Sequence, residues 1–188
     1  MSENWITEGF AKSGALLEGH FVLRSGLHSG RFFQAALLLQ YPEMAERYCS
    51  ALAGKFSGSG IEAVISPAVG GLIVGHEVAK ALGVRAIFAD KQDGELVLKR
   101  GFSIKPGEKV LVAEDVVTRG GRVQQTVDLV RSFGGEVAGI AVVVDRSGGN
   151  ASFDVPFESM AKLELETFQP DDCPLCAKGV PIEKPGSK

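Results

Sequence analysis

Two adjacent carboxylates, Glu114 and Asp115, stand at the end of an apolar run in the stretch VLVAEDVVTRGGR, residues 110–122. The run 110–113 is apolar at every position, which predicts a strand that is buried on both faces. Placing two carboxylates beside such a core costs desolvation free energy unless cations or hydrogen-bond donors meet them. The partner of this acidic pair is therefore the first question that the sequence raises about chemistry.

The turn that follows, Thr118–Arg122, offers a place for an anion. It precedes a helix predicted over 121–133, so free backbone N–H groups and the helix dipole would face a ligand there. Gly120 and Gly121 allow the backbone to approach an anion closely, although the pattern GxxxxGK[ST] of a Walker loop is absent. A ligand with both a phosphate and sugar hydroxyls would suit the turn and the acidic pair together. The alternatives are a ligand-free tight turn and a pair of surface carboxylates.

Length and composition favour one soluble domain. The 188 residues are enough for a single domain, and the apolar fraction of 45% is ample for a core. A net charge of −3 leaves no basic excess for neutralising nucleic-acid phosphates. The sequence contains no apolar stretch of membrane-spanning length and only three cysteines, which is few for a disulfide scaffold. We therefore expect a cytoplasmic protein with neither nucleic acid nor membrane as a partner.

Hydrophobic periodicity predicts an α/β core that begins near residue 60, because the order strand, turn, helix, strand occurs twice, as in parallel sheets. The predicted helices span 4–17, 42–56, 72–83 and 121–133. The predicted strands are two within 19–34, then 61–66, 84–90, 110–113 and 136–145, with a charged hairpin at 91–101 and an edge strand at 161–168. In such sheets ligands bind beyond the carboxyl ends of the strands, where 66–71, 89–100 and 114–122 would meet.

The stretch VLVAEDVVTRGGR resembles the phosphoribosyl pyrophosphate (PRPP) signature of type I phosphoribosyltransferases: an apolar strand, two acids, two apolar residues, Thr, a variable residue, Gly and a small residue. The segments GHFVLRSGLHSGRFFQ and VVVDRSGG resemble parts of orotate phosphoribosyltransferases, and the resemblance extends from Gly19 to Gly149. It implies a type I phosphoribosyltransferase fold, with a central, mainly parallel sheet flanked by helices. The parts would be an N-terminal α+β hood over about 1–58, a core over about 60–168 with a mobile hairpin, and a loosely held tail over about 169–188.

The same resemblance implies an activity and its partners. Phosphoribosyl would pass from PRPP to N1 of orotate, giving orotidine 5′-monophosphate and pyrophosphate, a step of pyrimidine biosynthesis. It implies Mg²⁺ bound mainly through PRPP or pyrophosphate, and a homodimer in which the hairpin is shared between subunits. Two rivals remain open: a phosphoribosyltransferase for purines, and a regulator that kept the PRPP pocket and lost catalysis.

The resemblance also implies roles for individual residues that stand at matching positions of this sequence. For PRPP, the resemblance implies Glu114, Asp115, Val116, Val117, Thr118, Arg119, Gly120, Gly121, Arg122, Ala68, Val69, Gly70 and Lys91. For orotate, it implies Arg24, Phe32, Phe33, Thr118 and Arg146, and for catalysis Lys91, Asp115 and Glu114. An arginine fork suits a carboxylate-bearing ring, and phenylalanine suits its flat face. No protein metal ligand is implied.

This sequence departs from the family pattern in three places. Val69 and Gly70 stand where some relatives carry a lysine, Arg119 stands where the family has a small residue, and 89–101 contains no histidine. Each assignment also has a structural alternative: a strand-end Arg146, Phe32 and Phe33 within the hood core, and solvated charges on the hairpin.

The pair Cys173 and Cys176 supplies only two ligands, whereas structural zinc sites usually have four. Cys49 and the three histidines, His20, His28 and His76, lie far away in the sequence. A redox dithiol would need a thioredoxin-like setting, which the sequence does not show. We therefore expect a structural pair on a short helical turn that begins at Asp171 or Asp172.

Overall fold

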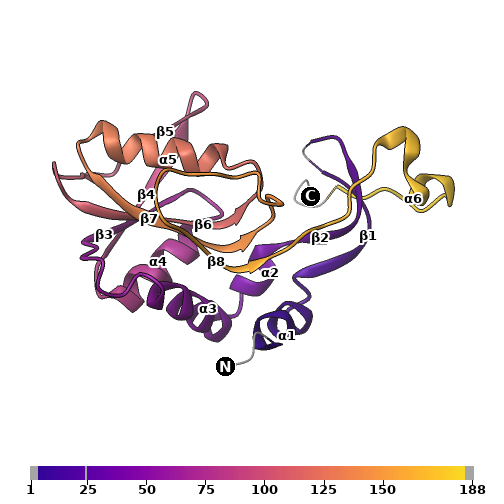
Figure 1. Cartoon of the computed structure of the whole chain (residues 1–188), viewed down its shortest axis with the longest axis horizontal. Helices are drawn as coiled ribbons and strands as arrows, with labels where there is room; N and C mark the ends of the chain where they lie inside the picture. Colours follow the sequence, from indigo (N-terminus) through magenta and orange to yellow (C-terminus); the bar gives the residue numbers. More distant parts are fainter. Residues whose placement is uncertain (1–3, 24, 185–188) are drawn as a thin grey trace. The chain divides into compact units, whose positions relative to one another are not determined.

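The computed structural model describes residues 4–23 and 25–184, which fold into two compact units (Figure 1). One unit combines the residues up to Leu38 with those from Glu164 onward, and the other extends from Leu39 to Leu163. This division differs from the expected one. The helix expected at 42–56 lies in the sheet unit rather than in the hood, and the expected tail folds with the N-terminal residues.

The larger unit contains a six-stranded sheet with the order β5-β4-β3-β6-β7-β8, in which β5 alone is antiparallel to its neighbour. The strands are β3 (Ala63–Pro67), β4 (Arg85–Gln92), β5 (Glu95–Leu98), β6 (Lys109–Val117), β7 (Glu136–Asp145) and β8 (Phe157–Lys162). The helices are α3 (Pro42–Gly54), α4 (Leu72–Leu82) and α5 (Gly121–Ser132). This mainly parallel sheet between helices confirms the predicted fold class.

The connections of the sheet run in opposite directions from its centre. The crossover β3–α4–β4 adds a strand on one side of β3, whereas β6–α5–β7 adds a strand on the far side of β6. Because parallel crossovers are right-handed, α4 and α5 must cover opposite faces of the sheet. The strand order therefore switches direction between β3 and β6, and such a switch point leaves a crevice at the carboxyl ends of the two strands.

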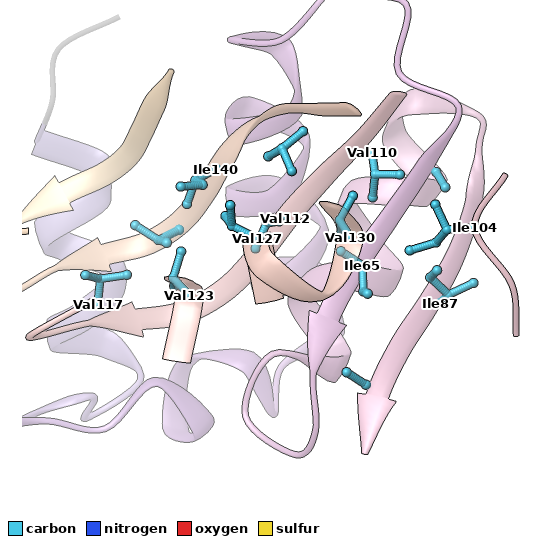
Figure 2. Packing of buried hydrophobic residues seen from close by; sticks show 14 residues of the cluster. Ile65, Ile87, Ile104, Val110, Val112, Val117, Val123, Val127, Val130 and Ile140 are labelled. Atoms are coloured by element: carbon cyan, nitrogen blue, oxygen red, sulfur yellow. The ribbon is translucent and has the colours of Figure 1, made fainter. Parts of the chain in front are cut away.

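Alternating side chains of the strands build a core on each face. On one face, α5 packs Val123, Val127 and Val130 against residues such as Ile65 and Val112 (Figure 2). The neighbours Val64 and Leu111 point to the other face, since strand side chains alternate, and that face is covered by α3 and α4. Each face holds fully buried aliphatic side chains, so the sheet is a rigid base for the loops at its edge.

The smaller unit is built on a hairpin. It contains α1 (Asn4–Lys12), β1 (Leu16–Val22), β2 (His28–Phe33), most of α2 (Ala35–Leu39), the 3-10 turn η1 (Pro170–Asp172) and α6 (Pro174–Ala177). The strands β1 and β2 pair antiparallel, as expected for 19–34. Within residues 4–23 and 25–184, no helix has both the length and the apolar character needed to cross a bilayer.

Three local predictions are corrected. The first helix ends at Lys12 rather than near residue 17, because Gly14 adopts a φ of 66° that stops the helix. The last strand spans Phe157–Lys162 rather than 161–168. The tail is not loosely held, because Phe168 and Glu183 form β-bridges with the hairpin. The helical turn next to the cysteine pair is α6, which begins at Pro174 with Cys173 as its N-cap rather than at Asp171 or Asp172.

Candidate functional site

The two predicted ligand-binding turns lie side by side in the sheet unit. The turn after β3 contains Ala68–Gly71, and the turn after β6 contains Thr118–Gly120. Since β3 and β6 are hydrogen-bonded neighbours and run parallel, both turns leave the same edge of the sheet. The predicted meeting of 66–71 with 114–122 is therefore confirmed, and it takes place at the switch point of the sheet.

The backbone of the first turn lies directly against the acidic pair. A Cβ atom added to Gly70 would lie 2.9 Å from Oδ2 of Asp115, and one added to Gly71 would lie 3.0 Å from Oε1 of Glu114. A side chain at either position would have to displace a neighbouring carboxyl group. The peptide between Ala68 and Val69 is cis, and Val69 is exposed at the tip of the turn. The two glycines thus bring the first turn and both carboxyl groups into one site.

Glu114 is a buried acid with spare hydrogen-bonding capacity. Its side chain is 3% exposed, and this burial, reinforced by the negative charge of Asp115, raises the pKa of Glu114 to about 9. Oε1 accepts a hydrogen bond of 3.2 Å from the Asp115 amide, while Oε2 has no partner among the described residues. A carboxyl group of raised pKa can donate a hydrogen bond at neutral pH, so Glu114 can serve a ligand as donor or acceptor.

Asp115 differs from its neighbour in exposure. It is partly exposed, and its Oδ1 accepts a hydrogen bond of 2.7 Å from the Val116 amide. Two carboxyl groups this close do not ionise with equal ease, because the first charge disfavours the second. Because Glu114 is the buried member of the pair, the raised pKa falls on it.

The second turn has the form of an anion site at a helix N-terminus. Gly120 caps α5 with a φ of 77°, and an added Cβ atom would lie 3.0 Å from Cζ of Phe153. Thr118, Arg119 and Arg122 are exposed around it. The first amides of a helix have no intrahelical acceptor, so this end offers donors and positive potential to an anion.

Arg146 follows the next strand of the same edge. Its amide donates a hydrogen bond of 2.8 Å to the Val117 carbonyl, which places it beside the end of β6. The side chain is half-buried, and burial lowers the pKa of Arg146, although an arginine keeps its charge in proteins. The adjacent Ser147 has a buried Oγ without a hydrogen-bond partner among the described residues. Ser147 is a further polar group of this loop that the sequence analysis did not single out.

The charged hairpin predicted at 91–101 is formed by β4 and β5. Lys91 is exposed on β4, opposite Leu96. Arg100, in contrast, is held at the base of the hairpin: its Nε lies 3.2 Å from Oδ2 of Asp90, and its guanidinium lies 5.3 Å from the ring centroid of Phe88. Lys91 is therefore better placed than Arg100 to act on a ligand.

The remaining orotate candidates belong to the smaller unit. Arg24 lies outside the described residues. Phe33 is 2% exposed and packs edge to face on Phe10, at 4.8 Å between ring centroids, so it is a core residue of this unit, which is the structural alternative given for the pair. Phe32 is partly exposed and lies 5.9 Å from Phe21 between ring centroids, and it remains a candidate.

The smaller unit also holds a cluster that the sequence analysis missed. His20, His28, Cys173 and Cys176 place one donor atom each within 4.8 Å of one another. His20 and His28 lie far from the two cysteines in the sequence, and the fold brings all four together. The spacing of the two cysteines is evident in the sequence. Their proximity to His20 and His28 depends on how the C-terminal segment crosses the hairpin.

Comparison with known proteins agrees with this geometry. Residues 39–169 match the phosphoribosyl transferase domain family. The chain is 54% identical over 181 residues to the orotate phosphoribosyltransferase of Carboxydothermus hydrogenoformans, covering 95% of each chain. It is 51% identical over 188 residues to that of Pelotomaculum thermopropionicum, covering 100% of this chain and 99% of the relative.

Solved structures show the same fold. Orotate phosphoribosyltransferase from Aeropyrum pernix superposes with a TM-score of 0.74 at 26% identity, covering 84% of this chain and 93% of that one. Adenine phosphoribosyltransferase from Thermoanaerobacter pseudethanolicus gives a TM-score of 0.62 at 19% identity, covering 71% of this chain and 88% of that one. Because proteins named for orotate and for adenine share the fold, the fold by itself does not identify the base.

Proposed function

This chain belongs to the orotate phosphoribosyltransferase family, and from that premise we propose how its residues divide the reaction among them. The enzyme is a pentosyltransferase that moves phosphoribosyl from PRPP to N1 of orotate, a step of pyrimidine biosynthesis. One observation carries the proposed site: Gly70 and Gly71 lie against the carboxyl groups of Asp115 and Glu114, beside the open N-terminus of α5.

PRPP binds across the two turns at the sheet edge, with its 5′-phosphate at one turn and its diphosphate at the other. The 5′-phosphate binds at the turn Thr118–Arg122, where the helix N-terminus and two arginines supply donors and positive charge. The ribose hydroxyls then bind Glu114 and Asp115, which adjoin this turn in the chain. The diphosphate extends along the turn Ala68–Gly70, whose backbone amides can donate to it.

Orotate binds beside the ribose and is held by cationic and aromatic groups. Arg146 is the cation of the sheet edge, and its fork geometry suits the orotate carboxylate. The family resemblance implies Phe32, Arg24 and Thr118 as further orotate contacts. Phe33 has no part in this assignment because it is buried in its own unit.

The chemical step exchanges one bond at C1 of the ribose for another. The C1–O bond to pyrophosphate breaks, the leaving group keeps the electron pair, and N1 of orotate forms the new bond while its proton passes to the departing pyrophosphate. Positive charge develops on the ribose, and the side chain of Asp115 stabilises it electrostatically. Glu114 holds its proton at neutral pH and orients a ribose hydroxyl by hydrogen bonding.

The leaving diphosphate needs positive charge as well. Partly exposed Asp115 offers oxygen atoms of the kind Mg²⁺ accepts, so the site suits an ion that arrives on PRPP. When bound, Mg²⁺ neutralises charge on the diphosphate. Lys91 adds a second cation from the hairpin, and closure of this hairpin excludes water that would otherwise hydrolyse PRPP.

The activity test follows loss of orotate absorbance in the presence of PRPP and Mg²⁺, with uracil, hypoxanthine and adenine as competing bases. We expect turnover of orotate alone. Lys91→Ala should lower kcat by about 100-fold, since it removes a charge that acts on the leaving group. Lys99→Ala, an exposed lysine at the base of the same hairpin, is the matched control and should stay close to wild type. Turnover of a purine would overturn the roles given to Phe32 and Arg146.

We further propose a homodimer in which Lys91 serves the site of the neighbouring subunit. Mixing inactive Lys91→Ala with inactive Asp115→Asn chains tests this directly. If Lys91 acts across the dimer, each mixed dimer contains one intact site, and a statistical mixture regains about a quarter of wild-type activity. If Lys91 acts within its own chain, one site of each mixed dimer carries Lys91→Ala and the other carries Asp115→Asn. Both sites are then defective, and the mixture stays inactive.

A further inference from the structure

We propose that His20, His28, Cys173 and Cys176 form a structural zinc site that fastens the C-terminal segment to the N-terminal hairpin. This site is separate from the catalytic residues of the sheet unit, and all four residues belong to the smaller unit. Two imidazole nitrogens and two sulfurs are a ligand set that Zn²⁺ accepts in tetrahedral structural sites.

The hairpin brings the two histidines to one face. His28 lies directly opposite Val22 in the antiparallel pairing of β1 and β2. The register shifts between Glu18 and Phe21, so His20 has no direct partner on β2, but its Nε2 lies 2.9 Å from Nδ1 of His28. The rings meet edge to face, with 4.9 Å between their centroids. Both side chains are buried, at 1% and 6% exposure, although the hairpin has only two strands.

The C-terminal segment covers this face by crossing from one edge of the hairpin to the other. On the β2 edge, Phe168 and His28 exchange backbone hydrogen bonds of 2.8 Å and 2.9 Å. On the β1 edge, the Glu183 amide donates to the His20 carbonyl at 2.7 Å, and the Val22 amide donates to the Glu183 carbonyl at 3.1 Å. The cysteines lie between these two anchors, so the crossing places them above the histidines.

The distances within the cluster suit a bound ion. Two donors on one tetrahedral Zn²⁺, with Zn–N of about 2.1 Å and Zn–S of about 2.3 Å, lie roughly 3.5 Å apart. Nε2 of His20 lies 3.5 Å from Sγ of Cys173 and 3.8 Å from Sγ of Cys176. Nδ1 of His28 lies 3.3 Å from Sγ of Cys176. The two ring nitrogens are 2.9 Å apart and need to separate by a few tenths of an ångström.

A second hydrogen bond orients one ligand. Nδ1 of His20 lies 2.8 Å from the Val180 carbonyl, and only a protonated Nδ1 can bond to that acceptor. In the neutral ring this leaves Nε2 unprotonated, which is the form a metal requires, and Nε2 is the atom that faces the cysteines. Val180 belongs to the same crossing segment as Cys173 and Cys176.

The C-terminal segment that crosses the hairpin, residues 164–184, is not held in place by burial of apolar side chains. Between Glu164 and Lys184, Cys173 is the one buried residue, at 4% exposure. Segments that bury so little surface are usually held by disulfides or metals. Cys173 and Cys176 form no disulfide with each other, and a metal bound by both would hold the segment in the same way.

The first test measures zinc in the whole chain, purified without a metal-binding tag. We expect about one Zn²⁺ per chain in the wild type, and its loss in Cys176→Ser and in His28→Gln. The controls are Cys49→Ala and His76→Gln, which remove a cysteine and a histidine of the sheet unit and should retain the zinc. A wild type that is purified without zinc, and that fails to take up added Zn²⁺ or Co²⁺, would overturn the proposal.

A second measurement needs no variant and so does not depend on a mutant that folds. In zinc-loaded protein, alkylation of Cys173 and Cys176 should be slow, although Cys176 is exposed, and a strong chelator should accelerate it. Cys49 is buried in α3 and serves as the internal control, unchanged by chelation. Equal labelling of Cys176 with and without chelator would refute a metal at this position.

Discussion

The raised pKa of Glu114 predicts a pH dependence of stability that a single substitution removes. In the unfolded chain this carboxyl group titrates near its ordinary value of 4.5, whereas in the fold burial and the charge of Asp115 raise its pKa to about 9. Between these values the folded protein keeps a proton that the unfolded chain releases. The free energy of unfolding of the ligand-free protein must therefore fall as pH rises across this range.

The magnitude follows from the number of pH units crossed. Each unit contributes at most about 1.4 kcal/mol while the folded group stays protonated and the unfolded group stays ionised. From about pH 6 to about pH 8, Glu114 should thus lower the free energy of unfolding by up to ~2.7 kcal/mol. Glu114→Gln has nearly the same shape and cannot titrate, so this contribution disappears in the variant.

Urea unfolding of wild type and Glu114→Gln at several pH values, at one protein concentration, isolates the effect. Groups remote from Glu114 are the same in both proteins, so their contributions cancel in the difference between them. The free energy of unfolding of Glu114→Gln, relative to that of wild type, should therefore increase as pH rises. Asp115→Asn removes the neighbouring charge and should weaken the dependence without abolishing it. Parallel profiles for wild type and Glu114→Gln would show that Glu114 is already ionised in the fold and would refute the reasoning.

Two further substitutions separate binding from stability. Gly70→Ala places a Cβ atom 2.9 Å from Oδ2 of Asp115, a movable side-chain atom, so we expect a KM for PRPP about tenfold higher or more with a free energy of unfolding within ~1 kcal/mol of wild type. Steady-state kinetics and urea unfolding of the same preparation check this. Gly120→Ala meets both a φ of 77° and the Phe153 ring at 3.0 Å, so it should cost about 1–2 kcal/mol of stability as well as PRPP affinity. An unchanged unfolding midpoint for Gly120→Ala would contradict the strain assigned to this turn.

The local pattern of the sequence determined most of the sheet unit. Apolar runs at 61–66 and 110–113 specify buried strands, and Gly83 ends α4 in the left-handed conformation expected of a terminal glycine. The acidic pair and the turn at Thr118–Arg122 are contiguous, so their joint chemistry could be inferred from spacing alone. These features can be predicted from the sequence because each depends on residues within a few positions of one another.

Tertiary structure decided the features that depend on distant contacts. The sequence does not distinguish the roles of Glu114 and Asp115. The burial of Glu114 in the fold does. Likewise, Phe32 and Phe33 are adjacent, and packing against Phe10 alone assigns Phe33 to the core.

The histidine–cysteine cluster is the clearest case. More than a hundred residues separate His28 from Cys173, and no periodicity or local propensity carries information across such a distance. Their meeting depends on the strand pairing that turns His20 and His28 to one face and on the backbone hydrogen bonds that draw the C-terminal segment across it. The sequence determined that a pair of cysteines and a pair of histidines exist, and the fold decided that they form one site.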